Sequence, residues 1–258
     1  MNARQKKTLF YLLVLIPCIC LSCHREIPVT EIVLTPGEAT LFIGETQEFT
    51  VQCFPEEATN TDQLLIYSSS EKIFTYENGV VTAKGAGNAA LTATCENVVA
   101  QARIKVYKDK LYKGNAVYGI DYATGYRYMM GQSTPQEMEI ELIHSGAYGT
   151  TQRFRAWITM DQVGKDLDFT QPLEGGPFVG TYANNNEDGY LIYGSYEGTP
   201  MIVRADWSDA DGITLTRGIL RIEDAGGFNR FRLHADFELS SGYKFGTDWE
   251  GSANMKIE

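Results

Sequence analysis

The sequence predicts an all-β protein that is built from two β-domains behind an export signal. Glycine, which marks turns, and tyrosine, which favours strands, are both frequent, with 25 and 15 copies in 258 residues. Strand-like runs alternate with turn residues along the chain, as expected for antiparallel sheets. We therefore expect a β-sandwich over residues 28–107, a linker over 108–111 and a larger antiparallel β-sandwich or barrel over 112–258.

The N-terminus has the pattern of an export signal. Segment 4–7 carries basic side chains and no acid, and the apolar stretch 9–21 is too short to span a bilayer comfortably. The stretch ends at Leu21-Ser22-Cys23, which resembles the lipobox of bacterial lipoproteins, where a small residue precedes a lipidated cysteine. The alternative is an ordinary secretory signal followed by an unrelated cysteine.

The lipoprotein resemblance implies a processed and anchored chain. Residues 1–22 would be removed, Cys23 would carry the lipid, and residues 23–27 would form a tether. Several acyl chains on one cysteine give stable anchoring, so a membrane is an expected partner. Because His24 rather than an aspartate follows Cys23, the resemblance implies sorting to the bacterial outer membrane, on either its periplasmic or its surface face.

The net charge disfavours one class of partner. The full chain has a formal net charge of −11, and loss of Arg4, Lys6 and Lys7 with the signal would take the mature chain to −14. A strongly acidic surface repels phosphate backbones. Nucleic-acid binding is therefore not expected.

Residues 28–107 contain short strand-like runs that are separated by turns. Residues 49–53 and 91–95 alternate apolar and polar side chains. Asn78-Gly79 is a tight-turn dipeptide between two further runs. Regularly spaced turns of this kind are typical of a β-sandwich.

The same region resembles the group 2 bacterial immunoglobulin-like domain, a module of adhesins and surface proteins. The resemblance rests on segments 33–36, 43–46, 53–55, 78–85 and 87–94. It implies an immunoglobulin-like β-sandwich. The chain departs from the family in having Tyr67 where a tryptophan usually precedes the Ser-Ser pair.

Two cysteines, Cys53 and Cys95, remain beyond the expected anchor. Each lies on the apolar parity of its strand, so both sulfur atoms should point into the core. In an immunoglobulin-like topology these strands face each other, and an oxidising compartment would allow a disulfide between them. Closing this loop of about 40 residues would stabilise the domain by roughly 4 kcal/mol. Two buried free thiols are the alternative.

The second domain shows clear two-residue periodicity. Residues 231–239 place apolar side chains on one parity and mainly charged ones on the other, which indicates a sheet with one wet face. The apolar parity changes between Ile213 and Leu220, which predicts a β-bulge near Arg217-Gly218. The single helix candidate is segment 160–167. No family is recognised for this domain.

One hairpin of the second domain offers a candidate binding surface. Pairing Leu142 with Gln152 sets Arg153 and Arg155 opposite glutamates, with Trp157 on the same polar face. The plain interpretation is a solvated ladder of ion pairs. The alternative is that Trp157, Arg153 and Arg155 form an exposed platform for a sugar or an aromatic group.

The sequence contains no convincing catalytic or metal site. The calcium-like segment 184–189 fails because Ser195 stands where a bidentate glutamate is required. No Cys/His cluster suits zinc, and no Gly-x-Ser-x-Gly elbow accompanies the histidines. A carboxylate pair for glycoside hydrolysis stays open, since sequence gives no distances. No cofactor is expected.

These observations give three hypotheses for function. The first is a non-enzymatic envelope lipoprotein for binding or adhesion, with the immunoglobulin-like domain as a spacer and the second domain contacting glycan or protein. The second is a structural or assembly component of an envelope complex, and the third is a carbohydrate-active enzyme. An exposed aromatic face would favour glycan binding, whereas a long unpaired edge strand would favour assembly.

Overall fold

A computed structural model describes residues 26–146, 151–169, 178–184, 187–196, 199–205, 215–240 and 242–258. Side chains are described for these residues except 178–215. The described residues form strands and two single-turn 3₁₀ helices, η1 (Thr61–Gln63) and η3 (Met160–Gln162), so the expected all-β class is confirmed. No helix in this part of the chain is long and apolar enough to cross a membrane.

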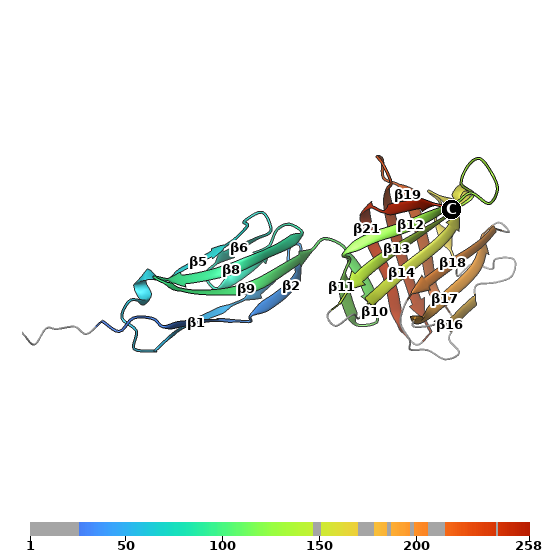
Figure 1. Ribbon diagram of the computed structural model, residues 1–258. Helices are drawn as coiled ribbons and strands as arrows, with labels where there is room; N and C mark the ends of the chain where they lie inside the picture. The colour runs from blue at the N-terminus through green and yellow to red at the C-terminus, as the bar shows by residue number, and fades with distance from the viewer. Residues whose placement is uncertain are drawn as a thin grey trace, which may run out of the picture. The chain divides into compact units, whose positions relative to one another are not determined.

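The chain divides near residue 105 into two compact units, both drawn in Figure 1. In the immunoglobulin-like region the strands form three small sheets, with orders β1-β4, β2-β9-β8-β5 and β3-β7-β6. The strands are β1 (Glu31–Thr35), β2 (Glu38–Phe42), β3 (Thr46–Glu48), β4 (Thr50–Phe54), β5 (Leu65–Ser68), β6 (Phe74–Glu77), β7 (Val80–Ala83), β8 (Gly87–Cys95) and β9 (Val98–Tyr107).

The core of this region follows from the alternation of side chains along its strands. Leu91 and Ala93 of β8 and Ala102 and Ile104 of β9 are almost fully buried. Successive strand residues point to opposite faces, so one parity of each strand builds the core. The expected tight turn at Asn78-Gly79 connects β6 to β7, and both of its residues have positive φ, which glycine and asparagine tolerate best.

The described strands of the second unit form two larger sheets. The six-stranded sheet has the order β11-β10-β21-β20-β19-β15, and the seven-stranded sheet has the order β16-β17-β18-β14-β13-β12-β22. The strands are β10 (Lys110–Lys113), β11 (Ala116–Gly119), β12 (Tyr122–Tyr128), β13 (Glu137–Ser145), β14 (Thr151–Thr159), β15 (Leu167–Asp168), β16 (Phe178–Asn184), β17 (Glu187–Tyr196), β18 (Thr199–Ala205), β19 (Leu215–Asp224), β20 (Arg230–Leu239), β21 (Lys244–Ser252) and β22 (Asn254–Ile257).

These two sheets pack face to face around one hydrophobic core. Met138, Ile140 and Leu142 on β13 join the same buried cluster as Leu233 and Phe237 on β20, and all five are fully buried. The described strands therefore form two hydrogen-bonded sheets that share one core. Each sheet keeps an outer face directed away from this core (Figure 1).

The register of the β13–β14 hairpin differs from the sequence-based expectation by two residues. Leu142 lies opposite Phe154 rather than Gln152, and Arg155 lies opposite Glu141 rather than Glu139. A slip of two residues leaves every side chain on its predicted face, because the period of a strand is two. Alternation alone therefore could not detect the error.

The bulge in the second unit agrees with the sequence-based expectation, whereas the direction of one strand pairing, the helix candidate and the linker differ from it. The ladder between β19 and β20 shifts between Leu215 and Arg217, so the β-bulge expected there is confirmed. The pairing of β22 with β12 is parallel, whereas only antiparallel pairing was expected. The helix candidate is limited to the single turn η3, and β10 begins at Lys110, inside the expected linker, because the fully buried Leu111 belongs to the core.

Candidate functional site

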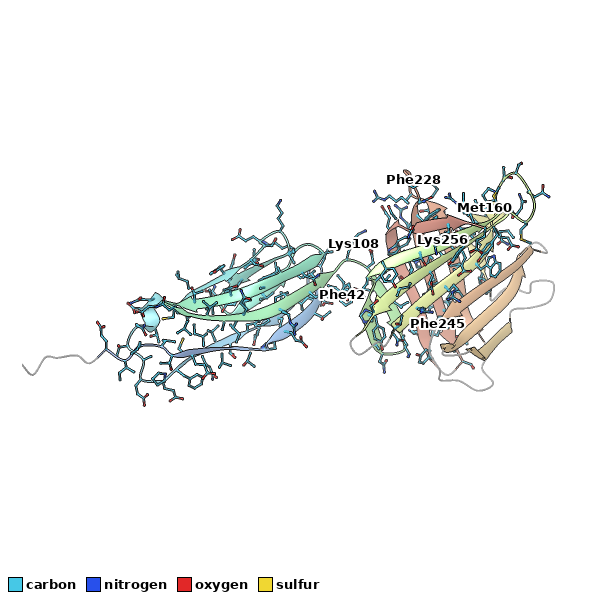
Figure 2. The ribbon with its side chains drawn as sticks, viewed as in Figure 1. Phe42, Lys108, Met160, Phe228, Phe245 and Lys256 are labelled. Atoms are coloured by element: carbon cyan, nitrogen blue, oxygen red, sulfur yellow. The ribbon has the colours of Figure 1, made fainter. Side chains whose placement is uncertain are left out.

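The outer face of the seven-stranded sheet gathers aromatic, acidic and basic side chains on four neighbouring strands. We call this set the outer network. It consists of Thr124, Tyr126, Tyr128, Glu137, Glu139, Glu141, Arg153, Arg155, Trp157 and Lys256. Lys256 marks the β22 edge of the network and is labelled in Figure 2. All of these side chains lie on the side of the sheet opposite to the core, because the register pairs most of them with one another across neighbouring strands.

The two arginines of the network pair with Glu139 and Glu141, and Arg155 and these two carboxylates are largely removed from water. Arg155 bridges two carboxylates, with its Nε 3.2 Å from Glu139 Oε1 and its Nη2 2.9 Å from Glu141 Oε1. The side chains are only 19%, 11% and 13% exposed, respectively. Arg153 approaches Glu141 at 3.7 Å, and the Thr124 hydroxyl donates to the same glutamate at 3.3 Å. Removing one member of such a cluster would leave a poorly solvated charge behind.

The aromatic members of the network form a stack above β13. The Tyr128 and Trp157 rings lie 5.1 Å apart at an interplanar angle of 25°, and Tyr126 stacks on Tyr128 at 6.0 Å and 24°. Lys256 lies over the Tyr126 ring, with its Nζ 5.5 Å from the centroid. The stack therefore runs diagonally from β12 to β14 and passes over the strand between them.

Hydrogen bonds tie this stack to the carboxylates beneath it. Trp157 Nε1 donates to Glu137 Oε2 at 2.9 Å, and the Tyr128 hydroxyl donates to Glu139 Oε2 at 3.1 Å. Burial, followed by the charge of Glu139 and the hydrogen bond to it, raises the pKa of Tyr128 to about 12. Tyr128 is thus held as a neutral donor, and Glu139 lies almost fully buried below the rings.

The three predicted ligand residues lie together, but they are less exposed and more fully paired than expected. Trp157, Arg153 and Arg155 share one strand and one face, as predicted. Trp157 is half-buried rather than fully exposed, because Tyr128 covers one ring face and Glu137 holds its N–H. The arginines are engaged by carboxylates, so the surface is better described as a fixed polar network than as an open platform.

Sequence reasoning missed Tyr126, Tyr128 and the role of Glu137. A signal was present, since tyrosines recur at positions 122, 126 and 128 on one parity of a strand. The contact between Tyr128 and Trp157 nevertheless joins two strands that are not neighbours in the sheet. Only the strand order reveals it.

The predicted disulfide between Cys53 and Cys95 is not formed in the structure, and both thiols are free. The Cys95 thiol, which is 1% exposed, donates to the carbonyl oxygen of Asn60 at 3.3 Å. Burial, with a contribution from nearby Cys53, raises the pKa of the Cys95 thiol. Cys53 is only half-buried on β4, which pairs with β1, whereas Cys95 ends β8 in another sheet. Parity placed Cys95 in the core correctly.

Several predicted features lie outside the described residues. These are the signal over 1–22, the lipidation site Cys23 and the centre of the calcium-like segment 184–189. Among the residues that the structure does describe, no group of three or more metal-ligating side chains gathers. His234 on the six-stranded sheet pairs with Asp248, and His144 Nδ1 lies 2.8 Å from the carbonyl oxygen of Gly119.

Comparison with known proteins bears on the first domain. Residues 28–106 match the model of the bacterial Ig-like domain (group 2), so this part of the chain is similar to that family. No match was found among curated proteins. Among solved structures, domains 5–6 of the S-layer protein SbsC are similar at 10% identity, covering 87% of this chain and 98% of that one, with a TM-score of 0.27. A similarity this low adds nothing to the argument.

Proposed function

We propose that this chain is a non-enzymatic lipoprotein of the bacterial outer membrane that binds glycan through the outer network. The immunoglobulin-like domain serves as the spacer, in line with the use of its family as modules of adhesins and surface proteins. The observation that carries the proposal is the stack of Tyr126, Tyr128 and Trp157 above a row of hydrogen-bonded carboxylates.

Such a surface matches the chemistry of a sugar. A sugar ring offers apolar C–H faces to aromatic side chains and hydroxyl groups to carboxylates and guanidinium groups. Because Trp157 and Tyr128 are already fixed by each other and by Glu137 and Glu139, little side-chain entropy is lost when a ligand binds. The network is therefore organised in advance for a polar ligand with flat apolar faces.

The same contacts favour binding over catalysis. Glycoside hydrolysis requires one carboxyl group that donates a proton and a second one at a defined separation. In the outer network Glu139 and Glu141 instead accept hydrogen bonds or pair with Arg155. A carbohydrate-active enzyme therefore remains the third candidate.

A glycan array tests the binding surface. The two-domain chain from residue 24 onward should be retained on a subset of glycans, and Trp157→Ala and Arg153→Gln should abolish retention. Arg153 is more exposed than Arg155, at 33% against 19%, so Arg153→Gln should disturb packing less than Trp157→Ala does. Arg232→Gln, on the outer face of the other sheet, is the matched control and should bind as the parent does. Equal loss in all three variants, or no retention at all, would reject the proposal.

The lipid anchor needs its own test. Detergent-phase partitioning of the expressed protein should place the parent chain in the detergent phase. Cys23→Ala should move the protein to the aqueous phase. An unchanged partition would show that Cys23 carries no anchor.

A further inference from the structure

The edge strand β5 of the immunoglobulin-like domain carries an unusual combination of exposed apolar side chains and open backbone groups. Leu65 is 65% exposed and Tyr67 is 50% exposed, and both leave the outer face of the four-stranded sheet. Val99 on β9, also on that outer face, is 59% exposed. Every residue from 26 to 107 is described, so β5 is the true end of this sheet, beside β8 (Figure 1).

The backbone of β5 presents hydrogen-bonding groups on its open side. Ser69 N donates to the carbonyl oxygen of Ala90, so residues 69, 67 and 65 direct their backbone groups towards β8. In an antiparallel ladder the intervening residues point the other way. Ile66 and Ser68 therefore direct their N–H and C=O groups away from the sheet.

The usual protection against strand pairing is missing at this edge. Proteins commonly place charged side chains on edge strands to prevent association. Edge strands β3 and β6 of the neighbouring sheet each end in a glutamate, Glu48 and Glu77, respectively. β5, with the sequence Leu-Ile-Tyr-Ser, contains no charge.

We propose that β5 pairs antiparallel with β5 of a second copy of this chain, so that the two four-stranded sheets become continuous. A two-fold axis at Tyr67 would set Ile66 opposite the partner's Ser68 and use all the outward backbone groups of both strands. Tyr67 then faces the partner's Tyr67, which buries both rings. Identical strands are self-complementary in this arrangement, which is why a second copy is the favoured partner.

Disulfide trapping tests the register directly. In the two-domain chain with Cys53→Ser, Tyr67→Cys should form a covalent dimer on mild oxidation, because facing residues of a non-hydrogen-bonded pair lie about 4.5 Å apart. Leu65→Cys is the matched control and should not cross-link, since its two copies would be four residues out of register. Equal cross-linking of both variants would indicate random collision and overturn the pairing, as would no cross-linking of either.

Sedimentation equilibrium provides a measurement without engineered thiols. The parent two-domain chain should show a monomer–dimer equilibrium, and Tyr67→Lys should raise its dissociation constant at least tenfold. Val99→Lys introduces the same charge on the same face, two strands from the edge, and should leave the equilibrium within twofold of the parent. A parent chain that stays monomeric at all concentrations, or a Val99→Lys variant that dissociates equally, would contradict the proposal.

Discussion

The two outer faces of the second domain are built from similar residues but differ in their exposure to water. Arg155, Glu139 and Glu141 on the seven-stranded sheet are 11–19% exposed. Arg232 on the six-stranded sheet bridges Glu223 and Glu250 in the same manner, yet it is 55% exposed and its partners are 21% and 29% exposed. Among the described residues, the stacked rings of Tyr126, Tyr128 and Trp157 have no counterpart on the outer face of β19–β21, where the stacked Phe237 and Phe245 belong to the core.

This difference shows that the alternation of charged side chains along a strand does not determine how much their ion pairs contribute to the free energy of unfolding. An exposed ion pair in water contributes little, because solvent and salt screen it. Forming a half-buried pair costs desolvation energy. Removing one of its partners lowers the stability strongly, because the other charge is then left poorly solvated. We therefore expect substitutions in the outer network to change stability far more than equivalent substitutions on the six-stranded sheet.

The largest effect is expected for Arg155→Ala. This change leaves Glu139 and Glu141 partly buried without their shared cation, and the free energy of unfolding should fall by about 2–3 kcal/mol. Urea denaturation followed by fluorescence measures it. Arg232→Ala is the matched control, and no resolvable change is expected there. Equal losses in both variants would remove the distinction between the two faces.

A smaller loss is expected for Trp157→Ala. The variant removes the stack on Tyr128 and the hydrogen bond to Glu137, so the free energy of unfolding should fall by about 2 kcal/mol, less than for a fully buried ring. Trp157→Phe keeps an aromatic ring and should recover about half of that loss. An unchanged unfolding midpoint for Trp157→Ala would show that the ring does not pack as described.

The Tyr128 phenol gives the outer network a signature at high pH. Its pKa of about 12 lies above the ordinary value of 10.0, so the folded state favours the protonated form. This contribution to stability is fully present below pH 10 and is lost as the pH rises towards 12. The difference in unfolding midpoint between the parent and Tyr128→Phe should therefore shrink from pH 8 to pH 11. A constant difference would indicate that the phenol titrates normally.

The smallest effect is expected at low pH on the six-stranded sheet. Hydrogen bonds from Arg221 and Arg232 lower the pKa of Glu223, and those from Arg232 and Arg230 lower the pKa of Glu250. Lowered pKa values add stability that is present above the ordinary value of 4.5 and is lost as the pH falls through the folded-state values. Arg232→Gln should move the acid unfolding midpoint slightly upward in pH at low salt. At 1 M salt the shift should vanish, because the Debye length is then only about 3 Å.

Local chemistry made part of this fold predictable. The dipeptide Asn78-Gly79 specifies a turn with positive φ, and the change of parity before Leu220 requires a bulge. The strand over 231–239 alternates so regularly that its buried and exposed faces follow directly from the sequence. These features depend on residues close together in the chain.

The candidate site was only half predictable, because its contacts depend on distance in space. Parity placed Trp157 on the correct face, but the register slip by two residues changed which glutamate each arginine meets. The stack on Tyr128 spans an intervening strand, which only the strand order of the sheet reveals. The two-residue period of a strand contains no information about pairing register or strand order.

A pair of double-mutant cycles tests the difference between the two outer faces most directly. One cycle combines Arg155→Ala with Glu141→Ala, and the other combines Arg232→Ala with Glu250→Ala, each measured by chemical denaturation at the same pH and salt. We expect a coupling free energy of about 1–2 kcal/mol for the first pair, because it is half-buried, and none that exceeds experimental error for the second. Equal coupling in the two cycles would contradict the view that one face is a pre-organised site and the other an ordinary solvated surface.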